Sequence, residues 1–275
     1  MIYLSPENRS AFGDETFWVW FERNFTNTSY DLPSSYKDGD VVLRYSTMGA
    51  IHASPGKSIA LCWELLPELK RLFKTDVWDV PIAKTYLAAK SCDRILITSE
   101  FSRKDYEPFG KVDILPIGVD TDLFRPYSAE EKTVFRVKYN VPLDKEVGFW
   151  CGTTHPMKGY QNVQAYAKEH PEIYWVLVWY SAKGEPILNS HNYGVVTQKV
   201  LAELMNCADF QLSASILRPY YIVEYEGMAC NLKQRKMSDI EKDFEAGDNP
   251  RDVIFEKQWD RKTCKILYQN YINNL

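Results

Sequence analysis

The stretch Gly-Phe-Trp-Cys-Gly-Thr-Thr-His-Pro-Met-Lys-Gly-Tyr, residues 148–160, joins the end of an apolar strand to a glycine turn and the start of a helix. A glycine turn lets backbone amides approach a phosphate closely, and a helix N-terminus adds partial positive charge. Lys158 would supply a compact point charge for a diphosphate. A tight turn with a surface lysine has the same pattern, so the stretch alone leaves both interpretations open.

Short β-like runs alternate with helical stretches on both sides of this turn, which predicts parallel sheets built from βαβ units. Before the turn we expect the strands Ile2–Leu4, Asp40–Tyr45, Ser58–Trp63, Arg94–Thr98 and Val112–Leu115, and the helices Glu15–Asn24 and Val80–Lys90. From Ala129 onward we expect the strands Val147–Cys151, Ile173–Tyr180, Gly194–Val196 and Phe210–Leu212, and the helices Ala129–Tyr139, Gln161–Glu169, Gln198–Cys207 and Val223–Cys230. A polar amphipathic helix is expected from about Arg251.

The segment Gly118–Pro126 has the Gly, Asp and Pro punctuation of a connector between the two series. We therefore expect an α/β protein with an N-terminal lobe of residues 1–117 and a C-terminal lobe of residues 118–256. A C-terminal helix at about 257–275 could pack back on the first lobe. Ligands of open α/β folds collect at the carboxyl ends of the strands, so the expected site lies there.

Composition excludes several classes of protein. Of the 275 residues, 45% are hydrophobic and 25% charged, as in an ordinary globular domain. The net charge of −4 gives no global attraction to nucleic acid or to an anionic membrane. The sequence begins without a basic-then-apolar pattern and has no apolar run of bilayer length, so we expect a cytoplasmic protein. Its 6 cysteines form no C-x-x-C pair and are expected to be reduced core residues.

Three segments in order resemble the family-4 (group 1) glycosyltransferases, which are retaining enzymes of the GT-B fold. Ile-Leu-Pro-Ile-Gly-Val-Asp-Thr-Asp-Leu-Phe-Arg-Pro, residues 114–126, resembles the interlobe motif "pNGVDtdrFrP". The turn from Gly152 to Gly159 has the spacing of "GRlxxxKG", and residues 208–230 resemble "aDvfvxPSxxEpfGlvxlEAmAcG". Ser-Glu-Phe-Ser-Arg, residues 99–103, is similar to the common "vSefsr" segment. The resemblance spans roughly residues 90–231.

The resemblance implies two Rossmann-like lobes facing a central cleft and a glycosyltransferase of the hexosyltransferase type. The donor would be a nucleotide sugar, most simply a UDP- or GDP-sugar, and no cofactor would be needed. Lys158 would meet the diphosphate, and Glu226 would hold the ribose hydroxyls, for which a carboxylate is a suitable acceptor. A helix-start acid that stabilises the helix dipole is the alternative reading of Glu226. The other expected donor-site residues are Gly152, Thr153, His155, Gly159, Val195, Val196, Tyr220 and Tyr221.

The chain departs from the family pattern at several positions. Arg218 stands where the family has the first acid of E-x7-E, and Thr153 replaces the arginine of the glycine turn. Arg218 could bind the donor through its bidentate fork, or it could be a surface-loop arginine. On the acceptor side the nearest candidates are Glu64, Gly13 and His52. The family's last strand–helix pairs, expected after Cys230, are predicted to be trimmed or lost.

Several functions remain open at this stage. A transferase-like fold that binds a nucleotide sugar without catalysis is the main alternative, and a nucleotide-sugar epimerase of similar fold is a second. The acceptor could be a glycan, a lipid carrier, a protein or a modified nucleobase. Lys233, Arg235 and Lys236 could form a basic groove for DNA, although a solvated face is the simpler interpretation. Asp-Thr-Asp, residues 120–122, spells a D-x-D metal motif, but its place in the connector favours activity without a divalent metal.

Overall fold

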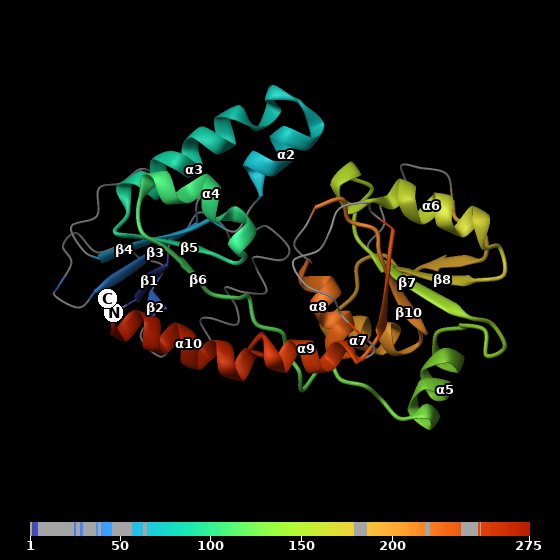
Figure 1. Cartoon of the computed structure of the whole chain (residues 1–275). Coiled ribbons are helices and arrows are strands. Elements are labelled where there is room, and N and C mark those ends of the chain that lie inside the picture. The colour runs from blue at the N-terminus through green and yellow to red at the C-terminus, as the bar shows by residue number, and fades with distance from the viewer. Residues whose placement is uncertain are drawn as a thin grey trace. The chain divides into compact units, whose positions relative to one another are not determined.

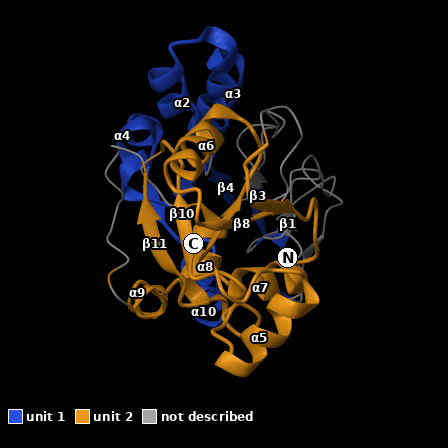
Figure 2. Cartoon of the chain, turned by 90° about the vertical axis from the view of Figure 1, so that its right-hand side faces the viewer, with its two compact units in different colours: residues 1–118, 262–275 blue, residues 119–261 orange. Residues whose placement is uncertain are grey.

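The computed structural model describes residues 2–4, 25, 28–29, 37, 40–45, 57–62, 65–178, 186–217, 221–237, 247 and 249–275. The chain divides into two compact units, Met1–Gly118 together with Lys262–Leu275 and Val119–Arg261 (Figure 2). Each unit contains one parallel sheet with helices on its faces, which confirms the predicted α/β class. Within the described ranges, no helix combines the length and the apolar character that a bilayer span requires.

The first unit is built on a six-stranded parallel sheet in the order β2-β1-β3-β4-β5-β6. Its strands are β1 (Ile2–Leu4), β2 (Thr28–Ser29), β3 (Val41–Tyr45), β4 (Lys57–Leu61), β5 (Arg94–Ile97) and β6 (Val112–Ile114). Its helices are α2 (Leu66–Phe73), α3 (Asp79–Ser91), α4 (Arg103–Tyr106) and α10 (Arg261–Asn273). The expected helix Glu15–Asn24 lies outside the described residues.

Helices cover both faces of this sheet. Ala89 of α3 and Tyr106 of α4 are buried with Ile95 on one face. On the other face Cys264 and Tyr268 of α10 are buried in the core of the sheet. Figure 1 shows α10 running along this side of the unit. The Tyr271 hydroxyl donates a 2.8 Å hydrogen bond to Asp113 on β6. The C-terminal helix is therefore part of the unit that the N-terminal strands build.

The second unit is built on a five-stranded parallel sheet in the order β11-β10-β7-β8-β9. Its strands are β7 (Val147–Cys151), β8 (Tyr174–Val178), β9 (Ser190–Asn192), β10 (Phe210–Ser213) and β11 (Lys233–Lys236). Its helices are α5 (Ala129–Lys138), α6 (Tyr160–Glu169), α7 (Gln198–Asn206), α8 (Ile222–Ala229) and α9 (Pro250–Glu256).

Alternate side chains of these strands enter two separate cores. Phe149 and Val176 pack with Met205 of α7 and Met228 of α8 on one face. Trp150, Trp175, Leu177 and Phe210 pack on the other face with Tyr160 and Val163 of α6. Figure 1 shows α6 on one side of this sheet and α7 and α8 on the opposite side. The helix that follows β7 and the helix that follows β10 therefore lie on opposite faces of the sheet, although the two strands are neighbours in it. Such a switch point opens a crevice at the carboxyl ends of the two strands.

One predicted strand of the second unit is misplaced, and one strand was not predicted. The strand expected at Gly194–Val196 lies earlier, at Ser190–Asn192, where it pairs with Trp175–Leu177. Gly194 has a φ of +66°, and its amide donates to Asn192 Oδ1, so the apolar residues after it belong to a turn. Lys233–Lys236 is an edge strand paired with β10, not merely a solvated face. Charged side chains commonly protect sheet edges, and here they made the strand difficult to recognise from the sequence.

Residues at the start of the second unit are clamped by side chains from α7 and α9. Asn206 accepts a 3.0 Å hydrogen bond from the Tyr127 amide and donates a 3.0 Å bond to the Arg125 carbonyl. Arg251 donates to the Thr121 carbonyl at 3.1 Å. The amide of Val119 donates to the Trp259 carbonyl at 2.8 Å. The connector motif is thereby integrated into the second unit.

The loops that follow β7 and β10 touch at Gly159. This residue has a φ of +71°, and a β-carbon on it would lie 1.8 Å from the Ala214 carbonyl oxygen. Gly194 has nearly the same backbone conformation, with a φ of +66°, but a β-carbon there would meet nothing within 4 Å. Comparing an alanine substitution at each of the two glycines therefore distinguishes the energetic cost of the left-handed backbone from the cost of the close approach.

We expect Gly159→Ala to lower the free energy of unfolding by roughly 3 kcal/mol or more, because a left-handed alanine and a displaced β10 loop both cost energy. Gly194→Ala, the matched control, should lose only about 1 to 2 kcal/mol. Denaturant unfolding of the three proteins measures both values. Equal losses in the two variants would show that the Ala214 contact imposes no constraint.

Candidate functional site

Residues 152–159, between β7 and α6, form a loop whose polar groups bond mainly to each other. The amide of His155 donates to Thr153 Oγ1 at 3.3 Å, and the amide of Met157 donates to His155 Nδ1 at 3.3 Å. Pro156–Lys158 is a single 3₁₀ turn that ends at the left-handed Gly159. This turn brings the chain into α6 with Lys158 as its last residue.

The loop that follows β10 is bonded directly to this one. The Ile216 amide donates to the Met157 carbonyl at 3.3 Å, and Asn162 of α6 donates its side-chain amide to the Ala214 carbonyl at 3.2 Å. Helices α6 and α8 begin just after these two loops, at the same edge of the sheet. Helix N-termini carry partial positive charge, so this edge favours an anion.

Lys158 and Tyr221 meet across the two loops. The Nζ atom of Lys158 lies 3.3 Å from the centroid of the Tyr221 ring, which is a cation–π contact. Tyr221 immediately precedes α8, and burial raises the pKa of its phenol further above physiological pH, where a phenol is already neutral. The sequence-predicted lysine therefore lies beside the start of α8.

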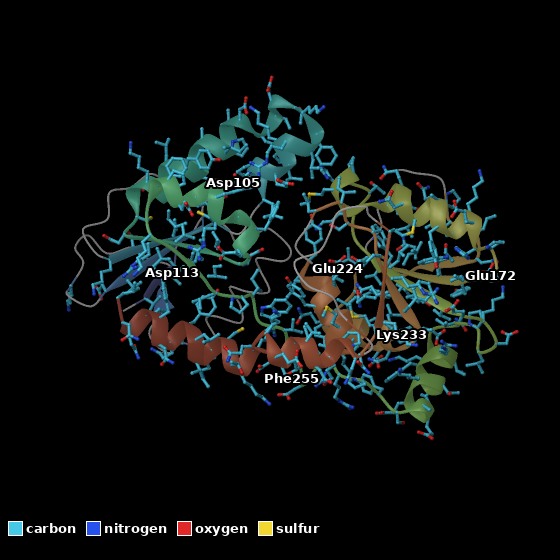
Figure 3. The ribbon with its side chains drawn as sticks, in the orientation of Figure 1. Asp105, Asp113, Glu172, Glu224, Lys233 and Phe255 are labelled. Carbon is cyan, nitrogen blue, oxygen red and sulfur yellow. The ribbon has the colours of Figure 1, made fainter. Side chains whose placement is uncertain are left out.

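The first turn of α8 is fixed by Glu224, which Figure 3 shows near the start of this helix. One carboxylate oxygen of Glu224 accepts a 2.8 Å hydrogen bond from the Tyr221 amide. The other accepts a 2.6 Å bond from the Ser213 hydroxyl at the end of β10. Both Ser213 and Glu224 are buried. The residue that performs the helix-start role considered for Glu226 is therefore Glu224.

Glu226 is only 5% exposed and lies two residues after Glu224 in α8. Among the described residues, no hydrogen bond or ion pair reaches its carboxyl group. Burial raises the pKa of Glu226 to about 8, Arg261 opposes this increase and Asp120 adds to it. A buried carboxyl without a protein partner is expensive, and such groups occur often at functional sites.

Lys158 and Glu226 both act on the pKa of Cys151, at the end of β7. Burial and the charge of Glu226 raise the pKa of the Cys151 thiol to about 12, whereas Lys158 lowers it. Cys151 is the last residue of β7, at the carboxyl end of that strand. Lys158 lies in the loop that follows β7, and Glu226 lies in α8, the helix that follows the neighbouring strand β10.

Some of the remaining expected site residues are described by the structure, and others lie outside the described ranges. Gly152 and Gly159 shape the loop, and burial and the charge of Lys158 lower the pKa of His155. Val195 is 74% exposed, and Val196 is partly buried against the core, in the loop after β9 at the same sheet edge. Arg218 and Tyr220 lie outside the described residues, as do Glu64, Gly13 and His52.

The Asp-Thr-Asp sequence has a structural role in the connector. Asp120 Oδ1 accepts hydrogen bonds from the amides of Asp122 and Leu123, at 3.2 and 3.1 Å. Asp120 Oδ2 lies 3.3 Å from Arg261 Nη1. In the described part of the chain, no three His, Cys, Asp or Glu side chains are grouped as metal ligands would be.

Sequence reasoning missed the contributions of Ser213, Glu224 and Arg261. Ser213 and Glu224 act through a contact between a strand end and a helix start, which no local pattern reveals. The spacing of Tyr221 and Glu224, a helix-preceding residue with an acid three positions later, resembles a capping box and was the available signal. Arg261 left no signal near the connector that it contacts.

Comparisons with known proteins find the same fold in solved structures of low sequence identity. No protein-family model matches the sequence, and comparison with curated proteins gives no match. Anabaena HepE in complex with UDP-glucose is 13% identical, with 100% of this chain and 99% of that chain covered and a TM-score of 0.70. WaaG, a glycosyltransferase involved in lipopolysaccharide biosynthesis, is 12% identical, with 99% and 90% covered and a TM-score of 0.62.

Sucrose-phosphate synthase from Thermosynechococcus elongatus is 15% identical, with 84% of this chain and 69% of that chain covered and a TM-score of 0.62. Identities at this level establish the fold alone. The chain has the GT-B fold with Rossmann-like parallel sheets, as the sequence predicted.

The raised pKa of Glu226 predicts a specific pH dependence of stability. Between its ordinary value of 4.5 and about 8, the unfolded chain has lost this proton while the folded protein keeps it. The folded state then binds more protons, so stability falls as pH rises, by at most about 1.4 kcal/mol per pH unit, and levels off above pH 8. Glu226→Gln removes this effect.

We therefore expect Glu226→Gln to gain stability relative to the natural chain as pH increases from 5 to 8, in urea unfolding at each pH. Glu169→Gln, which replaces an exposed acid at the end of α6 in the same unit, is the control and should follow the natural chain. Parallel curves for all three proteins would contradict a proton held at Glu226.

Proposed function

We propose that this protein is a glycosyltransferase that moves a sugar from a nucleotide-sugar donor to an acceptor. The observation that carries the proposal is the position of Lys158 against Tyr221, where the loops after β7 and β10 meet, together with the buried Glu226 of α8. A cation beside a helix N-terminus suits a diphosphate, and a buried carboxyl that no described residue pairs suits the hydroxyls of a ribose. HepE, which shares the fold, was crystallised with UDP-glucose.

The chemistry follows from where charge develops. When the sugar–phosphate bond breaks, negative charge grows on the departing diphosphate. Lys158 and the amides at the starts of α6 and α8 are positioned before the reaction to stabilise that charge. No protein nucleophile is needed, so the proposed course is a front-face transfer with retention, as in family 4. A phosphate oxygen of the leaving group would accept the proton of the acceptor hydroxyl.

The finer features of the donor site belong to the same proposal. UDP- and GDP-sugars are the expected donors, and a hexosyl group is the sugar expected to be transferred. The loop after β9, which carries the exposed Val195, is proposed to border the nucleobase. Metal-independent transfer is proposed because Lys158 and the helix starts supply the positive charge that a metal supplies in other transferases.

A binding module without transferase activity is the second candidate. Two observations favour it: Thr153 replaces the family's arginine and bonds to the backbone of its own loop, and Arg218 replaces the family's first acid. The site would then bind the nucleotide sugar but stabilise the departing diphosphate less. Measuring catalytic turnover distinguishes the transferase from the binding module, whereas measuring donor binding alone does not.

Removing the charge of Lys158 tests the donor site. We expect Lys158→Met to weaken UDP binding about 10- to 100-fold, because a hydrogen bond between charged groups contributes about 1.5 to 3 kcal/mol. Binding of uridine, which lacks phosphates, should change little. Titration calorimetry measures both ligands.

Lys168→Met is the matched control, since Lys168 is exposed in the last turn of the same helix, α6, that Lys158 precedes. It should bind UDP like the natural chain. An equal effect of the two substitutions, or an equal loss of UDP and uridine binding in Lys158→Met, would remove Lys158 from the diphosphate site.

Donor hydrolysis tests catalysis before the acceptor is known. We expect slow release of glucose from UDP-glucose, first in the α configuration, with a rate unchanged by EDTA. Proton NMR follows the anomer directly. Binding of UDP-glucose without release, in the presence of a panel of sugar acceptors, would favour the binding module. Loss of turnover in EDTA with recovery in Mn²⁺ would overturn the metal-independent mechanism.

A further inference from the structure

We propose that Tyr221 is a positioning residue that holds the Lys158 ammonium at the start of α8 through its ring. The identity of the ligand, a nucleoside diphosphate, rests on the proposed function. The contact between the two residues does not, because it exists in the protein without any ligand.

The ring holds the ammonium without neutralising it. A lysine on a flexible four-carbon stem loses about 2 kcal/mol of rotamer entropy when it is fixed, so a preorganised position has to be stabilised by some partner. A carboxylate partner would offset the positive charge that the phosphate needs. The Tyr221 ring, with its centroid 3.3 Å from Nζ, attracts the cation but carries no net charge. Burial keeps its phenol neutral by raising the pKa.

The ring itself is fixed by the strand behind it. The backbone amide of Tyr221 donates to Glu224, and the same carboxylate accepts from Ser213 at the end of β10. All three residues lie in buried or partly buried positions. The backbone from which the ring projects is therefore tied to the end of β10.

The backbone of Lys158 is tied to the same two loops. Its amide donates to the His155 carbonyl at 2.9 Å, and the next residue, Gly159, contacts the Ala214 carbonyl. The neighbouring Met157 carbonyl accepts from Ile216. Because both ends of the cation–π pair are anchored to β7 and β10, the ammonium has a defined place before a ligand arrives.

Preorganisation of this kind changes affinity through the cost of ordering the lysine. Without the ring, Lys158 can still reach a diphosphate, but the ligand has to order the side chain. We expect Tyr221→Leu to weaken UDP binding about 5- to 30-fold, which corresponds to the loss of a partly desolvated cation–π contact. Tyr221→Phe keeps the ring and should bind UDP within about twofold of the natural chain.

A double-mutant cycle decides whether Tyr221 acts through Lys158. In the Lys158→Met background, Tyr221→Leu should cause no further loss of UDP affinity. An equal loss in both backgrounds would mean that Tyr221 acts independently, and unchanged affinity in Tyr221→Leu alone would mean that it does not position the lysine. Either result overturns the inference.

A second measurement requires no ligand and also serves if Tyr221→Leu folds poorly. The ε-methylene protons of Lys158, identified by their absence in Lys158→Met, should resonate upfield of the other lysine signals because of the ring current. Tyr221→Phe should keep the shift. An unshifted Lys158 signal in the natural chain would overturn the inference even if UDP binds.

A failure of the inference about Tyr221 can be distinguished from a failure of the proposed function. Binding of UDP to the natural chain, with a neutral Tyr221→Leu variant and an unshifted Lys158 signal, would leave the proposed function intact and remove the role of Tyr221. Failure to bind UDP-, GDP-, ADP- or CDP-sugars would remove the proposed function, and with it the phosphate role assigned here to the Lys158–Tyr221 pair.

Discussion

The close approach of Gly159 to the Ala214 carbonyl is the constraint on which the site depends. The loops after β7 and β10 leave opposite faces of one sheet and still have to meet at its edge. Only a residue without a β-carbon fits there, because such an atom would lie 1.8 Å from the Ala214 oxygen. Once that contact forms, Lys158 precedes it and Tyr221 follows the partner loop, so the ammonium and the ring meet.

The two functional side chains are held in opposite electrostatic ways. The Tyr221 ring adds no negative charge beside Lys158, whereas burial raises the pKa of Glu226 to about 8, so the negative charge of Glu226 is suppressed near neutral pH. The nearby Arg261 and Asp120 form an ion pair with each other. Lys158 and the starts of α6 and α8 therefore favour an anion at this edge of the sheet. A protonated carboxyl can both donate and accept hydrogen bonds, which suits a diol.

Much of this second unit could be predicted from local pattern. The apolar run at Val147–Cys151 matched β7 because a strand buried on both faces needs apolar residues throughout. The β9 prediction was wrong since Val195 and Val196 look strand-like although Gly194 already turns the chain. β11 was missed since its Lys and Arg side chains protect an edge. The Lys158–Tyr221 contact was not predictable because it joins segments far apart in the sequence.

The departure at Thr153 makes the preorganised lysine more important. In this chain the Thr153 hydroxyl accepts from the His155 amide, and the His155 ring accepts from the Met157 amide. These polar side chains stabilise the turn, and Lys158 is the only lysine or arginine in residues 152–159. In the family-4 glycosyltransferases that the sequence resembles, an arginine stands at this position, and under the proposed function it would share the diphosphate charge with the lysine. With one cation in the loop, the effective affinity depends more steeply on how often that ammonium already occupies its bound position. A neutral ring anchored to β10 raises that occupancy without reducing the charge.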